Sequence, residues 1–142
     1  MIRSKIFFIL IITSSMAFYA CEEVVFVLES IPENTPEKAT IYVTGNFNFW
    51  DPGDSEFTLS TTPEGQYFIR LPKGKGRIQY VFTRGDWNTK ETDICGNPIK
   101  NRTFEYGSLD TLYLNIGSWK DKHPLNCPDD TTVIKIYPKE TK

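Results

Sequence analysis

The side chains that could act as catalytic groups are few and lie apart in the sequence. The one histidine, His123, stands between a lysine and a proline with no nucleophile-elbow motif nearby, so a Ser–His–Asp triad is not indicated. Asp51, Asp54 and Glu56 cluster in a turn, where acidic residues are ordinary, and a small domain offers little room for a hydrolytic cleft. A calcium site at these acids, or at Asp129–Asp130, is the weaker alternative. We therefore expect no enzyme active site, no metal and no cofactor.

The first 20 residues are typical of a secretory signal. Two basic residues precede a wholly apolar run at residues 6–12, which is shorter than the stretch of about 20 residues that crosses a bilayer. Cys21 follows this segment, as in the lipidation motif that it resembles in bacterial lipoproteins, and Glu22–Glu23 resembles the surface-export signal of Bacteroidetes lipoproteins. We expect residues 1–20 to be a signal peptide and Cys21 to be lipidated, giving an exported cell-envelope lipoprotein on the outer membrane or cell surface, with the lipid as its only membrane contact. Ordinary secretion with an unmodified Cys21 is the alternative.

The other two cysteines, Cys95 and Cys127, form an even pair in a chain expected to reach an oxidising compartment. No CxxC motif and no Cys/His spacing typical of a metal site accompanies them. We therefore expect a disulfide between them. The formal net charge of −2 and the lack of a basic cluster argue against nucleic acid as a partner.

Turn residues divide the chain into short strands, and no stretch has the 3.6-residue period of a helix. Ile78, Tyr80 and Phe82 alternate with more polar neighbours and mark the clearest half-buried strand. The expected strands are Val24–Leu28, Ala39–Thr44, Phe57–Ser60, Tyr67–Leu71, Ile78–Thr83, Trp87–Thr92, Thr103–Tyr106 and Leu112–Ile116.

Seven or eight short strands in roughly 100 residues predict an all-β fold, an immunoglobulin-like two-sheet antiparallel β-sandwich. The connections are too short for the crossover helices of a parallel sheet. We expect the sandwich to occupy residues 21–121. Residues 122–142 form a C-terminal extension, in which Val133–Tyr137 could add an edge strand before Pro138.

Three segments resemble starch- and glycogen-binding modules. Gly45 followed by the run Phe47–Trp50 is similar to a turn of family 48 carbohydrate-binding modules and of the glycogen-binding domain of the AMP-activated kinase β subunit. The run Tyr80–Arg84, then Trp87 and the run Asn101–Phe104, are similar to family 20 starch-binding modules. The resemblance covers nearly all of the chain after the signal.

The resemblance implies an all-β module that binds an α-glucan such as starch or glycogen and has no catalytic activity. Trp50 and Trp87 are expected to stack on the C–H faces of the sugar rings, and Asn101 to hydrogen-bond sugar hydroxyls. Arg102 is expected to be structural, and Trp119 a packing residue.

The sequence also departs from the family 20 pattern. Val81 stands where the family has a lysine, and Lys100 where it has a proline. The span from Trp87 to Asn101 is longer than in family 20 and contains Cys95, which could displace Asn101 from the sugar. Packing roles for Trp50 and Trp87 therefore remain an alternative. The corresponding alternative function is a structural or protein-interaction sandwich, accessory to an exported enzyme or surface complex, whose protein partners the sequence does not identify.

Overall fold

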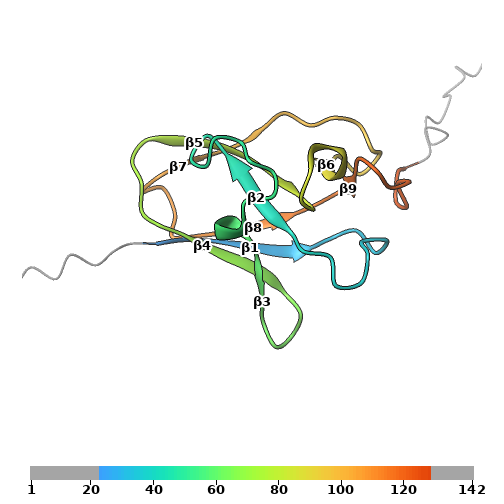
Figure 1. The fold of residues 1–142 in the computed structure, drawn as a ribbon. Coiled ribbons are helices and arrows are strands. Elements are labelled where there is room, and N and C mark those ends of the chain that lie inside the picture. The colour runs from blue at the N-terminus through green and yellow to red at the C-terminus, as the bar shows by residue number, and fades with distance from the viewer. Residues whose placement is uncertain (1–22, 129–142) are drawn as a thin grey trace, which may run out of the picture.

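The computed structural model describes residues 23–128 and contains short strands and two single-turn 3-10 helices, without an α-helix in this part of the chain (Figure 1). This confirms the predicted all-β sandwich. The predicted signal peptide, the lipidation site Cys21, the acidic pair Asp129–Asp130 and the edge strand Val133–Tyr137 lie outside the described residues. The strands are β1 (Val24–Ser30), β2 (Tyr42–Gly45), β3 (Ser60–Thr61), β4 (Tyr67–Leu71), β5 (Arg77–Thr83), β6 (Glu91–Thr92), β7 (Arg102–Glu105), β8 (Thr111–Asn115) and β9 (Ser118–Trp119).

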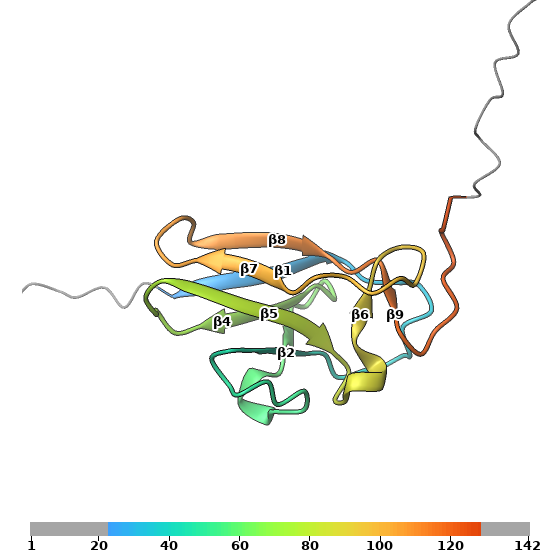
Figure 2. The same ribbon diagram turned by 90° about the horizontal axis from the view of Figure 1, so that it is seen from above.

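The strands form two facing sheets and a small ribbon. One sheet has the order β3-β4-β1-β8 and the other β2-β5-β7, while β6 and β9 pair at one end of the molecule (Figure 2). Apolar side chains of both sheets fill the space between them, as the alternation at Ile78, Tyr80 and Phe82 on β5 predicts. Phe26 of β1 lies with its ring centroid 4.7 Å from Tyr80 of β5 and 5.9 Å from Phe104 of β7. Burial raises the pKa of the Tyr80 phenol to about 12.

One strand pair differs from the all-antiparallel expectation. β1 and β8 run parallel, with Val25 opposite Thr111 and Leu28 opposite Leu114. Two parallel strands that follow each other in the sequence usually need a crossover helix between them. Here six other strands, β2 to β7, lie between β1 and β8 in the sequence and make the connection. The length of single connections therefore does not exclude this pairing.

The strand expected at Ala39–Thr44 begins only at Tyr42. The backbone N–H of Ala39 donates to the carbonyl of Pro36 at 3.0 Å, and Lys38 has a φ of +63°, so this stretch is a turn. The strand or strand edge expected at Phe57–Ser60 is confirmed only in part, because Thr58 forms an isolated bridge with Tyr42 and β3 begins at Ser60. The 3-10 helix η1 (Ser55–Phe57) occupies its start, because the Asp54 carboxylate accepts from the N–H of Glu56 at 3.1 Å and caps the turn.

The strand expected at Trp87–Thr92 is shortened for a similar reason. Trp87–Thr89 forms the 3-10 helix η2, and only β6 continues as strand. Trp119, at the end of β9, is fully buried as predicted, and its indole N–H donates to the Thr35 hydroxyl at 2.8 Å.

Candidate functional site

The chain leaves β2 through a tight loop at residues 46–54, called the Trp50 loop here. Gly45, the last residue of β2, directly precedes this loop. Glycine is required there because a Cβ would overlap the carbonyl oxygen of Gln79 on β5. The N–H of Trp50 then donates back to the Gly45 carbonyl at 2.9 Å. The loop therefore folds back on the end of β2 and does not extend into solvent.

A buried asparagine braces the Trp50 loop from inside. The side-chain oxygen of Asn48 accepts from the Gly45 N–H at 2.9 Å and from the Thr44 hydroxyl at 3.2 Å. Its amide nitrogen donates to the Asp51 carbonyl at 3.3 Å and to the Asp54 carboxylate at 3.4 Å. One side chain thus ties both ends of the loop together. Sequence reasoning missed this role, although an asparagine between two aromatic residues in a turn is a usable signal.

The aromatic residues of the Trp50 loop differ in burial and in contacts. Phe47 packs on Phe57, with ring centroids 4.9 Å apart, and so anchors the loop to the sandwich. Trp50 is half-buried, whereas Phe49 is exposed. Phe49 and Trp50 have φ values of +56° and +61°, a left-handed conformation that costs roughly 1–2 kcal/mol per residue. The braced loop imposes this conformation on both.

Trp87 opens η2 on the neighbouring loop. The Asp86 carboxylate accepts from the Asn88 N–H at 2.6 Å, and the Thr89 hydroxyl donates to the Asp86 carbonyl at 2.8 Å. The same hydroxyl oxygen accepts from the N–H of Arg84 at 3.0 Å. The Trp87 side chain remains 42% exposed on this capped turn. It lies in no strand, so the alternative role of a cross-strand packing residue is wrong.

The two tryptophan loops contact each other. The Thr83 hydroxyl donates to the Pro52 carbonyl at 2.5 Å, and a Cβ on Gly53 would lie only 2.9 Å from the Gly85 carbonyl oxygen. Trp50 stands two residues before Pro52, and Trp87 two residues after Gly85. The structure therefore brings the loops of these two predicted site residues together at one side of the molecule.

Val81 lies next to this region and is fully buried. It pairs with Thr44, whose hydroxyl bonds Asn48 of the Trp50 loop. Strict alternation on β5 predicts that Val81 faces outward, on the polar side of the strand. Val81 is buried because the Trp50 loop folds back over this side of the strand. Position 81 therefore has no cation to match the lysine of family 20 modules.

A cavity of about 300 Å³ lies beside Trp87, at the lower end of the size range of small-ligand sites. The Lys120 ammonium donates to the Trp87 carbonyl at 3.5 Å. The cavity combines apolar surface, from the indole and a proline, with two ammonium groups. Its lining is Trp87, Lys90, Glu91, Thr92, Gly96, Pro98 and Lys120.

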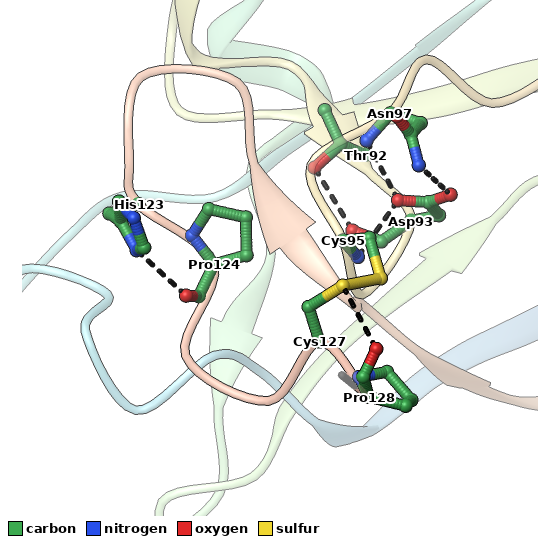
Figure 3. The surroundings of a disulfide bond; sticks show 8 residues. All are labelled: Thr92, Asp93, Cys95, Asn97, His123, Pro124, Cys127 and Pro128. Carbon is green, nitrogen blue, oxygen red and sulfur yellow. Dashed lines mark hydrogen bonds between the residues drawn. A yellow bond between two sulfur atoms is a disulfide. The ribbon is translucent and has the colours of Figure 1, made fainter. Parts of the chain in front are cut away.

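The predicted disulfide is present and holds one wall of this cavity. Cys95 and Cys127 are joined, and Figure 3 shows the bond between the Cys95 turn and the segment after β9. Gly96 has a φ of +81°, and a Cβ there would lie 2.8 Å from Pro124. The Asp93 carboxylate accepts from the backbone N–H groups of Asn97 at 2.7 Å and Cys95 at 2.9 Å. Hydrogen bonds from the Asn97 side chain and backbone hold the pKa of Asp93 below its usual value.

The segment after β9 is also tied to the end of β5. Asp121 forms an ion pair with Arg84, whose guanidinium lies 5.1 Å from the Trp119 ring centroid. Burial raises the pKa of Asp121, but the hydrogen bond and charge of Arg84 outweigh it, so this pKa lies below the usual range. Lys120 is thereby held at the cavity between buried Trp119 and the ion-paired Asp121.

Arg102 is structural, as the sequence predicts. Its guanidinium donates to the Glu91 carboxylate at 2.7 Å and to the Asn115 carbonyl at 2.7 Å, and it lies 5.6 Å from the Phe82 ring centroid. Burial lowers the pKa of Arg102, but its hydrogen bonds with Glu91 and the charge of that carboxylate raise the pKa above its usual value.

Glu91 itself was not predicted to have a role. It is 1% exposed, and its carboxylate also accepts from the Phe82 N–H at 2.9 Å.

Asn101, the third predicted sugar-binding residue, is exposed and precedes β7 directly. It is not part of the cavity lining beside Trp87. The structure connects it to that cavity only through its neighbour Arg102, which holds the lining residue Glu91.

The remaining candidate groups can be placed only where they fall within residues 23–128. His123 is exposed, and its Nδ1 lies 2.9 Å from the Pro124 carbonyl oxygen. Within residues 23–128, no three His, Cys, Asp or Glu side chains gather closely enough to hold a metal ion. None of the helices described in this range is long and apolar enough to cross a membrane.

Comparison with known proteins relates this sandwich to short parts of two large enzymes. The chain is 40% identical over 96 residues to an alpha-amylase of Niallia circulans, a match of 66% of this chain and 7% of that protein. It is 30% identical over 119 residues to an amylopullulanase of Thermoanaerobacter thermohydrosulfuricus, covering 78% of this chain and 8% of that protein. No protein-family model matches the chain. The molecule is an all-β sandwich domain that spans less than a tenth of the length of these curated relatives.

Proposed function

We propose that this domain binds α-glucans without acting on them. The observation that carries the proposal is the pair of tryptophan loops, held together by the hydrogen bond from Thr83 to Pro52. The similarity to small parts of an alpha-amylase and an amylopullulanase supports the choice of α-glucan, because their names identify enzymes that act on such chains. A match to so small a part of each enzyme favours an accessory, non-catalytic role.

The chemistry of the two loops suits a sugar chain. A glucose ring presents apolar C–H faces, on which a flat indole can pack, and hydroxyl edges, which need polar partners. Trp87 offers its exposed ring beside a cavity edged by Lys90 and Lys120, whose ammonium groups can donate to hydroxyls. Asn101 is proposed as a further polar contact at the margin of this surface. Hydrogen bonds hold the backbone of both loops before the ligand arrives, so little backbone entropy is lost on binding.

The test is affinity electrophoresis of the wild-type protein in native gels that contain amylose, glycogen, cellulose or xylan. We expect retardation in the amylose and glycogen gels and none in the cellulose and xylan gels. Because stacking is largely uncharged, the retardation should change little with salt. Equal migration in all four gels would contradict the proposal.

We also propose that the protein is exported and anchored by a lipid on Cys21, with residues 1–20 as its signal. Expressed with this leader in a Gram-negative host, wild-type protein should partition into detergent, and Cys21→Ser should release it into the soluble fraction. A soluble, unmodified wild-type protein beginning near residue 22 would rule the anchor out.

A further inference from the structure

Phe49 is the large hydrophobic residue that the described structure exposes most. Its side chain is 97% exposed, compared with 64% for Tyr113 and 42% for Trp87. Single exposed hydrophobic residues are common and by themselves indicate nothing. The backbone that presents this one distinguishes it from the others.

The backbone at Phe49 is held in a conformation that a phenylalanine rarely adopts. Its φ is +56°, and it lies between buried Asn48 and half-buried Trp50, also at positive φ. Such conformations persist only where the surroundings impose them, and they concentrate at binding sites. Here the four hydrogen bonds of the Asn48 side chain impose it.

The exposure of Phe49 contributes nothing to the stability of the sandwich. The nearby Phe47 anchors the loop by packing on Phe57, so a polar residue at position 49 would keep the hydrogen bonds and the ring contact that hold the loop. A small or left-handed-tolerant residue such as asparagine would suit the turn better. The aromatic ring therefore requires a reason other than folding.

We propose that Phe49 is a third aromatic contact for the α-glucan, adjoining the contact made by Trp50. The inference rests on the proposed function and adds a ligand-binding residue that sequence reasoning did not identify. A flat ring that is fully open to solvent can stack on the C–H face of a glucose unit, and the braced loop has already ordered the backbone that carries it. Phe49 and Trp50 are consecutive in this braced loop, so a sugar chain bound at the loop is placed to contact both residues.

The test is calorimetric titration of four variants and wild type with maltoheptaose, a soluble α-1,4-glucan. Phe49→Ala and Phe49→Leu should each weaken binding about 5-fold or more, because both remove the flat ring. Phe49→Tyr should bind within about 2-fold of wild type, because it keeps the ring. Tyr113→Ala removes an exposed aromatic from β8, in the other sheet, and should leave the affinity unchanged. None of the Phe49 variants should lower the midpoint of thermal unfolding.

The outcomes separate this inference from the proposed function. Wild-type binding with an unchanged Phe49→Ala affinity would overturn the role of Phe49 alone. A wild-type protein that binds no maltoheptaose would overturn both. Equal weakening by Phe49→Tyr would exclude stacking as the mechanism. A wild type that is dimeric by sedimentation, and becomes monomeric in Phe49→Ala with unchanged sugar affinity, would assign the ring to contact between copies instead.

Discussion

Replacing Glu91 by alanine should lower the free energy of unfolding by about 3 kcal/mol. The Glu91 side chain is fully buried and accepts hydrogen bonds from the Arg102 guanidinium and the Phe82 N–H. Its removal leaves a cation and a backbone donor without their partner in the interior. The Arg102 side chain keeps 23% exposure, so water can solvate part of its charge. This places the expected loss at the lower end of the range for broken buried ion pairs. The total free energy of unfolding of a small domain is only about 5–15 kcal/mol.

Urea denaturation followed by circular dichroism measures this loss. A matched control is Glu105→Ala, which removes the exposed ion pair between Arg77 and Glu105, whose side chains are 69% and 53% exposed. That change should cost less than about 1 kcal/mol. Glu91→Gln keeps an oxygen for the Phe82 N–H and should fall between the two. If Glu91→Ala and Glu105→Ala shift the urea midpoint equally, the buried pair does not have the structural role assigned to it.

Removal of the disulfide should have an effect of similar size. The double substitution Cys95→Ser, Cys127→Ser opens a loop with a sequence separation of 32 residues. Loop-closure entropy gives a loss of about 3–4 kcal/mol. The Cys95 turn also supplies Gly96 and Pro98 to the cavity beside Trp87, so we expect weaker binding of maltoheptaose as well.

The same urea experiment, with and without a reductant, tests the disulfide. Reduced wild-type protein should unfold at the same urea concentration as the double variant, and the reductant should not affect the variant. An oxidised wild type that unfolds together with its reduced form would show that the bond adds no stability. Free thiols on Cys95 and Cys127 in protein produced in an oxidising compartment would show that the bond does not form.

The sequence predicts those features of the fold that depend on local pattern. Alternation on β5 identifies Tyr80 and Phe82 as core residues, and an even pair of cysteines identifies the disulfide. The parallel pairing of β1 with β8 does not follow from local pattern, because it joins two strands that lie far apart in the sequence. The 3-10 turn at Trp87 was missed although its Asp-x-x-Thr capping box is visible in the sequence, because a segment that follows a strand and a short turn also suits a hairpin partner.

The candidate site was predictable in its residue types and not in its geometry. A resemblance indicated Trp50 and Trp87, and the structure shows that their loops contact each other. No local signal shows that Glu91, between a lysine and a threonine, is buried, because its partner Arg102 lies on another strand, β7. The exposed ring of Phe49 was equally hidden, since a phenylalanine in an aromatic run is ordinarily assigned to the core.

The role of the two tryptophan loops is tested most directly by calorimetric titration of wild type, Trp50→Ala and Trp87→Ala with maltoheptaose. We predict that wild type binds and that each variant binds about 5- to 150-fold more weakly, while its circular dichroism spectrum remains of the β type. Trp50 is half-buried, so its variant should also unfold at a somewhat lower temperature than Trp87→Ala. Folded variants that bind as tightly as wild type, or a wild type that binds no α-glucan, would contradict the account.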